Sequence, residues 1–270
     1  MKTLLVVNGE KYWQDLLPEF KVVRKRIQDT NWVLRDHKLY VVDDDSVEQP
    51  DVILWRVGAI KPSPIQQTAL NLIKLAKIPC VNSAETLLQG YDRLSMLAAL
   101  QACDLPVVPF NVVTKSAQLK NVQLPFPFVV KAGNYHGGYG KVLVQDEEKW
   151  QDVKDLLFIS NEYITVEPFI NYKKDIRYLA IGTQVWAMSR KGKFWKANVE
   201  TKAFKTITPA EAQIQQIKKI QAYLKADILA IDILEEADGT QHIVEYNDIP
   251  GLSGFADVLK HALANIVKEK

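Results

Sequence analysis

Two carboxylates and one amide near the carboxyl end of the sequence have the spacing of a metal-binding set. Asp238-Gly239 lies between two apolar runs, a setting that predicts a tight β-hairpin centred on this dipeptide. Asp232 then stands directly opposite Glu245, and Asn247 points to the same face because side chains alternate along a strand. Like charges in direct opposition destabilise a sheet unless a cation separates them, and oxygen ligands of this kind suit Mg²⁺. An acidic face that is solvated, or paired with Lys and Arg, is the alternative interpretation.

A glycine-rich loop is a second candidate site. Gly133, Gly137, Gly138 and Gly140 place four of the 12 glycines between two β-rich runs. Glycine leaves backbone N–H groups free to close around an anion such as phosphate, and Lys131 before the loop can reach that anion as a point charge. The loop is not of the GxxxxGK[ST] type, because a strand follows it in place of a helix. A mobile hairpin lid without a ligand is the alternative.

The composition is that of a soluble globular protein. The chain has 270 residues, of which 47% are hydrophobic and 24% charged, enough for one large domain or two to three small ones. A net charge of +2 with dispersed basic residues argues against nucleic acid and favours a small molecule or a peptide as partner. No apolar run has the ~18–20 residues that a membrane span needs, and no signal sequence is apparent, so we expect a cytoplasmic protein. Cys80 and Cys103 lack disulfide or metal spacing and are expected to be buried structural thiols.

The first part of the chain predicts a small parallel α/β unit. Apolar runs at 3–8, 52–57 and 79–81 are expected strands, and 64–77 is an expected helix. Arg56 closes the second strand, where loops commonly build ligand sites, although a structural ion pair is equally compatible with its position.

The next part predicts a long helix over 84–102. Ser83 is its expected cap, and Asp92-Arg93 is expected on its solvated face. Further expected elements are a helix over 147–157, a strand over 162–170, a helix from a capping box at Thr208 to Lys225, and a terminal helix over 255–267.

Six segments recur in an order typical of one superfamily. They are NSAETLLQGYDRLSML, FPFVVKAGNYHGGYGKV, EPFI, KDIRYLAIG, GKFWKAN, and AIDIL with IVEYNDIPGLSGF. This order resembles the ATP-grasp superfamily, in particular its branch of glutathione synthetases, ribosomal-protein and lysine-biosynthesis glutamate ligases, and synapsins. The resemblance implies a mixed α/β (α+β) ATP-grasp fold with an N-terminal Rossmann-like domain at 1–82. It also implies a central lid with the glycine loop at 83–166, and a carboxyl-terminal part with the metal site at 167–270.

The resemblance also implies a role for individual residues. The implied phosphate contacts are Arg93, Lys131, His136, Gly137, Gly138, Tyr139 and Gly140. The implied adenine and ribose contacts are Glu167, Pro168, Phe169, Ile170 and Asp175. The implied catalytic contacts, on the phosphate and metal side, are Arg190, Lys196 and Asn198. Asp232, Glu245 and Asn247 match the magnesium triad. Arg93 departs from the lysine usual in the family and lacks its compact ammonium group.

The activity implied by the resemblance is ATP-dependent ligation of a carboxylate to an amine through an acyl phosphate. The expected cofactors are ATP and two Mg²⁺ ions, with Mn²⁺ as an alternative ion. The expected partners are a small-molecule or peptide carboxylate and an amine acceptor, with no nucleic acid and no membrane span; a homo-oligomer is left open. EPFINYKKDIR and GKFWKAN are particularly similar to synapsin, and VETKAF lacks the glycines common in the ligase branch. A synapsin-like ATP-binding regulatory or scaffold protein without turnover is therefore the alternative.

Overall fold

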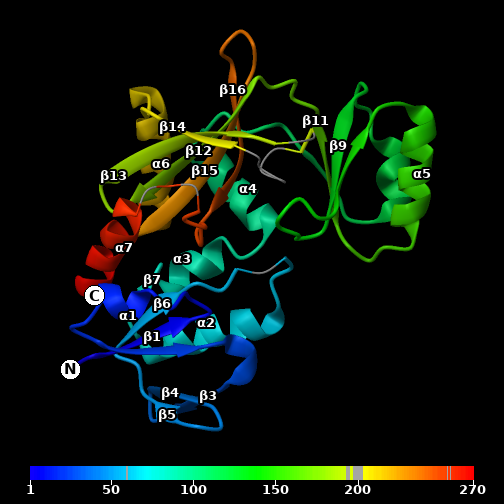
Figure 1. The fold of residues 1–270 in the computed structure, drawn as a ribbon. Helices are drawn as coiled ribbons and strands as arrows, with labels where there is room; N and C mark the ends of the chain where they lie inside the picture. Colours follow the sequence, from blue (N-terminus) through cyan, green and yellow to red (C-terminus); the bar gives the residue numbers. More distant parts are fainter. Residues whose placement is uncertain (59, 193–194, 197–202, 254, 256) are drawn as a thin grey trace.

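Four β-sheets organise the part of the chain that the computed structural model describes (Figure 1). That part comprises residues 1–58, 60–192, 195–196, 203–253, 255 and 257–270. Two sheets lie in the amino-terminal region, one in a projecting lid, and one in the carboxyl-terminal region. Within the described residues, none of the helices is long and apolar enough to cross a membrane.

The amino-terminal region combines a parallel sheet with a small antiparallel one. The parallel sheet has the order β2-β1-β6-β7, formed by β1 (Thr3–Val7), β2 (Lys21–Lys25), β6 (Val52–Trp55) and β7 (Cys80–Val81). Its helices are α1 (Trp13–Leu16), α2 (Pro64–Ala76) and a 3-10 turn, η1 (Ile27–Asp29). The antiparallel sheet consists of β3 (Asn31–Arg35), β4 (Lys38–Val42) and β5 (Val47–Glu48). The sequence patterns predicted β1, β6, β7 and α2, but not β2 to β5, most of whose residues are at least partly exposed.

The lid is an antiparallel sheet with one face covered by helical segments. Its order is β10-β9-β11-β8, formed by β8 (Asn111–Val113), β9 (Phe128–Ala132), β10 (Lys141–Val144) and β11 (Ile164–Pro168). The covering segments are α5 (Glu147–Phe158) and η2 (Ser116–Asn121), which share a hydrophobic core with the sheet. The expected helix at 147–157 and the hairpin around the glycine loop are both present.

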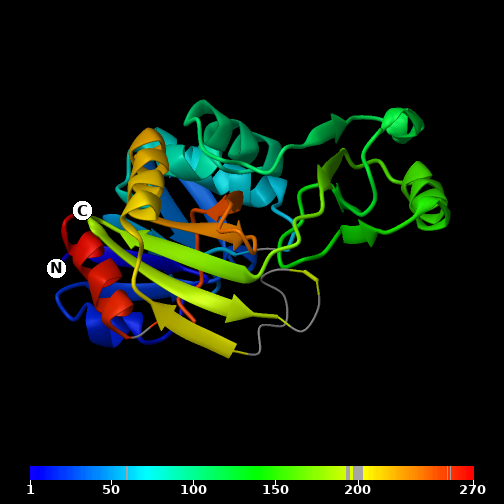
Figure 2. The same cartoon turned by 90° about the horizontal axis from the view of Figure 1, so that it is seen from above.

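The carboxyl-terminal sheet is antiparallel and lies between helices (Figure 2). Its order is β14-β13-β12-β15-β16, formed by β12 (Lys174–Ile181), β13 (Gln184–Lys191), β14 (Ala203–Ile207), β15 (Ile228–Glu235) and β16 (Gln241–Asn247). One face packs in a core with α4 (Arg93–Ala102) and α6 (Glu211–Leu224). The opposite face shares a core with α7 (Val258–Lys268) and the amino-terminal sheet. The β15-β16 hairpin therefore belongs to a sheet covered by α4 and α6 on one face and by α7 and the amino-terminal sheet on the other.

Two helix predictions were wrong in detail. The predicted helix over 84–102 is divided into α3 (Ala84–Gln89) and α4, because the Asp92 carboxylate accepts hydrogen bonds from two backbone N–H groups and starts a new helix. Arg93 is consequently 5% exposed and does not lie on a solvated face. The predicted capping box at Thr208 does not form: α6 begins at Glu211, and its N-cap Ala210 makes no side-chain cap bond.

Candidate functional site

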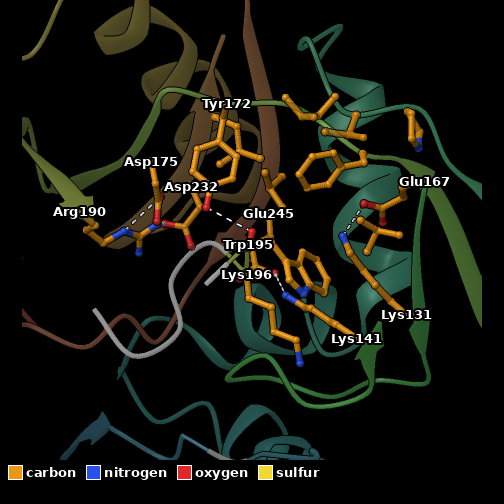
Figure 3. A pocket seen from close by; sticks show the side chains of 17 residues that line it. Lys131, Lys141, Glu167, Tyr172, Asp175, Arg190, Trp195, Lys196, Asp232 and Glu245 are labelled. Carbon is orange, nitrogen blue, oxygen red and sulfur yellow. Dashed lines mark hydrogen bonds and ion pairs between the residues drawn. The ribbon is translucent and has the colours of Figure 1, made fainter. Parts of the chain in front are cut away.

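A narrow cleft lies between the lid sheet and the carboxyl-terminal sheet (Figure 3). Its charged lining residues are Lys131, Lys141, Glu167, Asp175, Arg190, Lys196, Asp232 and Glu245. Its apolar and aromatic lining residues are Val108, Val129, Pro168, Phe169, Ile170, Tyr172, Trp195, Leu234 and Val244. The cleft has a volume of about 70 Å³, below the ~300 Å³ at which ligand pockets usually begin. The lid and the sheet would have to separate before a ligand of nucleotide size could enter.

The hairpin places Asp232 directly opposite Glu245, as the sequence predicted, but the turn and the strand register that produce this pairing differ from the prediction. The turn is one residue longer than the predicted two-residue type: the Glu236 N–H donates to the Thr240 carbonyl, and Gly239 adopts a φ of +90°. This turn alone would shift the register by one residue. A β-bulge between Asp232 and Ile233 restores the predicted opposition.

Asp232 is held by two arginines. Nε and Nη2 of Arg177 each donate to one of its carboxylate oxygens at 2.7 Å, and Nη2 of Arg190 lies 3.1 Å from Oδ1. Arg190 also donates to Asp175, and all these groups are largely buried. Burial alone would lower the pKa of Arg177, but the Asp232 carboxylate outweighs it and raises that pKa above its ordinary value. The solvated acidic face considered from the sequence is thus wrong for Asp232, whereas pairing with arginine is observed.

Glu245 faces cations from two other elements. Its Oε2 lies 3.8 Å from Nη1 of Arg93 on α4 and 3.7 Å from Nζ of Lys141 on β10. Burial opposes ionisation of this carboxyl group, yet Lys141, Arg93 and Lys131 together hold its pKa well below the usual range. Glu245 therefore stays ionised at neutral pH, although no described cation donates a hydrogen bond to it.

Asn247 lies next to the cleft but not in its lining. It shares a smaller cavity with Glu245 and Arg93, and it also lines a larger cavity toward the amino-terminal region. Its Nδ2 is buried and has no hydrogen-bond partner among the described residues. Within the same residues, no three His, Cys, Asp or Glu side chains gather in a metal-holding group.

Lys131 and Glu167 form a buried ion pair across the lid sheet. The two side chains are 4% and 5% exposed as whole residues and face each other in Figure 3. Burial lowers the pKa of Lys131, Glu167 raises it, and the neighbouring Lys141 and Arg93 lower it again, leaving it below its ordinary value. Lys141 pairs directly with Lys131 in the β9-β10 hairpin, so the two strands present two adjacent ammonium groups to the cleft.

Aromatic side chains form the apolar end of the cleft. The rings of Phe169 and Trp195 meet edge to face with centroids 6.4 Å apart, and the Tyr172 hydroxyl donates to the Trp195 carbonyl at 3.2 Å. Pro168 ends β11, and the Phe169 N–H donates to the Pro127 carbonyl.

The glycine loop joins the lid to both other regions. The His136 N–H donates to the Ile60 carbonyl at 2.7 Å, and Nζ of Lys196 donates to the Gly138 carbonyl at 3.0 Å. Gly140 accepts a hydrogen bond from the Ala132 N–H, while Tyr139 is 58% exposed. Loss of hydration lowers the pKa values of His136 and Lys196, so His136 is neutral at pH 7.

The structure thus brings most of the predicted residues to one place. Ten of them line the cleft: Lys131, Glu167, Pro168, Phe169, Ile170, Asp175, Arg190, Lys196, Asp232 and Glu245. Arg93 touches Glu245, whereas His136, Gly137 and Asn247 line the neighbouring larger cavity. Asn198 lies outside the described residues.

Sequence reasoning missed two contributors to the site. Lys141 could have been identified, because alternation along the two strands of the glycine hairpin places it beside Lys131. Tyr172 carries no local pattern that distinguishes it from other loop residues, and its place is shown by its position in the cleft lining and its hydrogen bond to the Trp195 carbonyl.

Solved structures show which class of protein has this fold. The chain matches an ATP-grasp RimK domain protein from Sphaerobacter thermophilus with a TM-score of 0.75 over 99% of both chains, at 17% identity. It also matches the ADP complex of N5-carboxyaminoimidazole synthetase from Staphylococcus aureus with a TM-score of 0.70, over 98% of this chain and 76% of that one, at 17% identity. The chain therefore has the ATP-grasp fold, with its cleft lying between the lid and an antiparallel sheet.

Sequence comparison then identifies the family. Residues 94–268 match the family described as "Synapsin, ATP binding domain", and the chain belongs to this family of ATP-grasp domains. The chain is 23% identical to Drosophila melanogaster synapsin over 74% of its own length but only 21% of that protein's length. It is 24% identical to the glutamate–LysW ligase ArgX of Sulfolobus acidocaldarius, over 74% of this chain and 76% of the ligase. Its relatives therefore include ATP-grasp ligases of similar size.

Proposed function

We propose that the chain is an ATP-dependent carboxylate–amine ligase that binds the nucleotide with Mg²⁺ in the cleft. The observation that carries this proposal is the opposition of Asp232 and Glu245 beside a group of buried cations. Two acidic groups at a metal position and cations at phosphate positions are the complementary halves of a site for a magnesium–polyphosphate complex.

The charges of the cleft support a polyanionic ligand. Four cationic and four acidic residues are found among its described lining residues. Arg93 and Arg177 add two positive charges through their contacts with Glu245 and Asp232, which leaves an excess of two. Lys131 gives up most of its hydration, and Glu167 is its one ion-pair partner among the described residues. A nucleotide phosphate would offer Lys131 a second anionic partner, and the aromatic end of the cleft would offer the base an apolar slot.

The residues present also fit a magnesium ion. Asp232, Glu245 and Asn247 supply only oxygen ligands of the kind that Mg²⁺ prefers. No described residue forms a hydrogen bond with Nδ2 of Asn247, so this amide can turn its oxygen toward an ion. When bound, the ion would neutralise charge on the transferring phosphoryl group. Arg190 and Lys196 would stabilise the same charge from the protein side, with the nucleotide-contacting backbone of the glycine loop closing over it.

The proposed reaction is balanced without a redox partner. The γ-phosphoryl group moves from ATP to a carboxylate oxygen of the first substrate, and ADP leaves. The amine of the second substrate attacks the acyl carbon, the acyl–oxygen bond breaks, and phosphate leaves with an oxygen that came from the carboxylate. Because water would hydrolyse the acyl phosphate, the glycine loop must exclude it during the reaction. Its contacts to Ile60 and Lys196 show that the loop can touch both neighbouring regions.

Oxygen transfer provides the test of this proposal. The protein is first screened for ADP formation against pooled carboxylates and amines, and ¹⁸O is then placed in the carboxylate that stimulates ADP release. We expect ¹⁸O in the released phosphate, and a hydroxamate product when hydroxylamine replaces the amine. Unlabelled phosphate would refute the acyl phosphate route.

A synapsin-like nucleotide-binding protein without turnover is the second candidate, favoured by the family match over residues 94–268. Such a protein would bind MgATP, but no carboxylate–amine pair would accelerate ADP release. The ligase relative that matches about three quarters of both chains favours turnover.

A further inference from the structure

A second cavity lies between the amino-terminal sheet and the end of the β15-β16 hairpin. Its volume is about 400 Å³, within the range of small-molecule pockets. Its walls are largely apolar and include Trp55, Val57, Leu70, Leu87 and Ile249. These five side chains also belong to, or pack against, one hydrophobic core, so that core fixes the shape of the apolar wall.

Shared lining residues connect this cavity to the cleft. The smaller cavity beside Arg93 has Gly90, His136, Asn247 and Asp248 in common with the larger one. It has Glu245 in common with the cleft. The larger cavity therefore adjoins the proposed metal position, next to the place where a phosphoryl group would be transferred.

The described residues that line the larger cavity include neither lysine nor arginine. Two cations follow β6 in the sequence, but each has a partner elsewhere. Nη2 of Arg56 donates to the Pro250 carbonyl at 3.0 Å, and Lys61 forms an ion pair with Glu162 of the lid. A negatively charged group against the apolar wall would therefore be buried without a cationic partner, which is costly.

The polar side chains of the cavity are either already bonded or close to the metal position. Oε1 of Gln66 accepts a hydrogen bond from the Ser63 N–H, and the Tyr91 hydroxyl donates to the Ser63 carbonyl. Asn247 and Asp248 lie at the end of β16, beside the proposed magnesium site. The cavity thus combines a polar edge at the metal position with an apolar wall formed by β6, α2 and α3.

We propose that this cavity binds the acid substrate of the ligase, and that this substrate is a monocarboxylic acid with an apolar body. The inference rests on the proposed function, because it names the acid that the reaction activates. The carboxylate lies at the polar edge beside Asn247, where the magnesium site offsets negative charge, and the body packs against Trp55, Leu70 and Leu87. Removal of the body from water favours binding, whereas a second carboxylate at the same wall would have no partner.

Two acids with the same number of carbons between their ends test this assignment. 5-Methylhexanoate ends in an isopropyl group where glutarate ends in a second carboxylate. Each is titrated at pH 8 into the full chain loaded with MgADP, and binding is followed by the indole N–H resonance of Trp55, identified with Trp55→Phe. We expect 5-methylhexanoate to shift this resonance and to bind at least tenfold more tightly than glutarate. No shift with 5-methylhexanoate, or equal or tighter binding of glutarate, would overturn the assignment.

Ile60→Lys provides a variant that adds a cation to the wall. Ile60 lines the cavity and is 54% exposed, so the change removes no core side chain. We expect it to reduce the preference for 5-methylhexanoate over glutarate at least threefold, because the lysine offers the second carboxylate a partner. The control Val47→Lys makes the same kind of change at a 64% exposed valine of β5, and it should leave the preference unchanged. An unchanged preference in Ile60→Lys would also overturn the assignment.

ADP release separates failure of this inference from failure of the ligase proposal. Stimulation of ADP release by other acids, together with no effect of 5-methylhexanoate at Trp55, would overturn the cavity assignment and leave the ligase proposal intact. Binding of 5-methylhexanoate at Trp55 without ADP release from any acid–amine pair of the screen would refute the ligase proposal and leave the cavity as a binding site for apolar acids.

Discussion

Replacement of Asn82 by alanine tests how the candidate site is held in place. Asn82 follows β7, is 1% exposed, and makes four hydrogen bonds to backbone groups distant in sequence. Its Oδ1 accepts from the N–H groups of Asp227 and Ile228 at 2.6 and 2.8 Å, and its Nδ2 donates at 2.7 Å to the carbonyls of Ile228 and Asp248. The pairing of β15 with β16 ends at Ala230 and Asn247, so Ile228 has no partner residue on β16. The side-chain amide of Asn82 makes the hydrogen bonds that such a partner would make.

The expected loss of stability follows from these four bonds. Each buried group left without a partner costs roughly 1–3 kcal/mol, which gives an upper range of about 4–12 kcal/mol for four groups. Water can enter the space left by the side chain and satisfy some of them, so we expect Asn82→Ala to lower the free energy of unfolding by about 3–5 kcal/mol. Nucleotide affinity in the presence of Mg²⁺ should fall as well, because Asp248 directly follows the proposed metal ligand Asn247.

Urea denaturation followed by circular dichroism measures the stability change, and calorimetry measures MgADP binding. The control Asn121→Ala removes an exposed amide whose one side-chain hydrogen bond among the described residues goes to Gln118, and it should change the free energy of unfolding by less than about 0.5 kcal/mol. Asn82→Asp keeps the volume but turns an oxygen toward two carbonyl groups, so it should destabilise at least as much as alanine. A change below about 1 kcal/mol for both Asn82 variants would refute the reasoning.

Three other predictions concern the metal, the loop and the thiols. Glu245→Gln should leave the fold intact but weaken Mg²⁺-dependent ADP binding at least tenfold and abolish turnover, because a neutral amide supplies less charge to an ion; calorimetry with unchanged Mg²⁺ dependence would contradict this. A double change of Gly137 and Gly138 to alanine should raise phosphate release relative to amide product, because their φ values of +67° and +82°, respectively, are ones that alanine adopts only with strain. An equal ratio of released phosphate to amide product in the variant and the wild type would exclude a closing role for the loop. Cys80 and Cys103 are buried, and burial raises the pKa values of both thiols. Neither thiol should therefore react with a thiol reagent at pH 8 until the protein unfolds. Rapid modification of the native protein would contradict a structural role for them.

Local patterns account for the parts of the fold that the sequence predicted. The strand at 3–8 and the helix at 64–77 have apolar patterns that match their observed burial, and Ser83 caps α3 through the Thr86 N–H as expected. The strands β2 to β5 were missed because much of each strand is at least partly exposed, which leaves no strong apolar signal. The division of 84–102 into two helices depends on Asp92, which caps α4. From the sequence, an aspartate that caps a new helix cannot be distinguished from one on the exposed face of a continuous helix.

The sequence by itself determined the β15-β16 hairpin and the hairpin that carries the glycine loop, because alternation along strands and turn residues act over a few positions. It predicted the opposition of Asp232 and Glu245 although its turn was one residue short, and only the observed bulge reconciles the two. The tertiary structure alone decided which charges meet, such as Lys131 with Glu167 across two strands of the lid. It also decided the cavity between the amino-terminal sheet and the end of the β15-β16 hairpin. These contacts join segments tens to more than a hundred residues apart, and their geometry depends on how whole sheets pack, which no local pattern encodes.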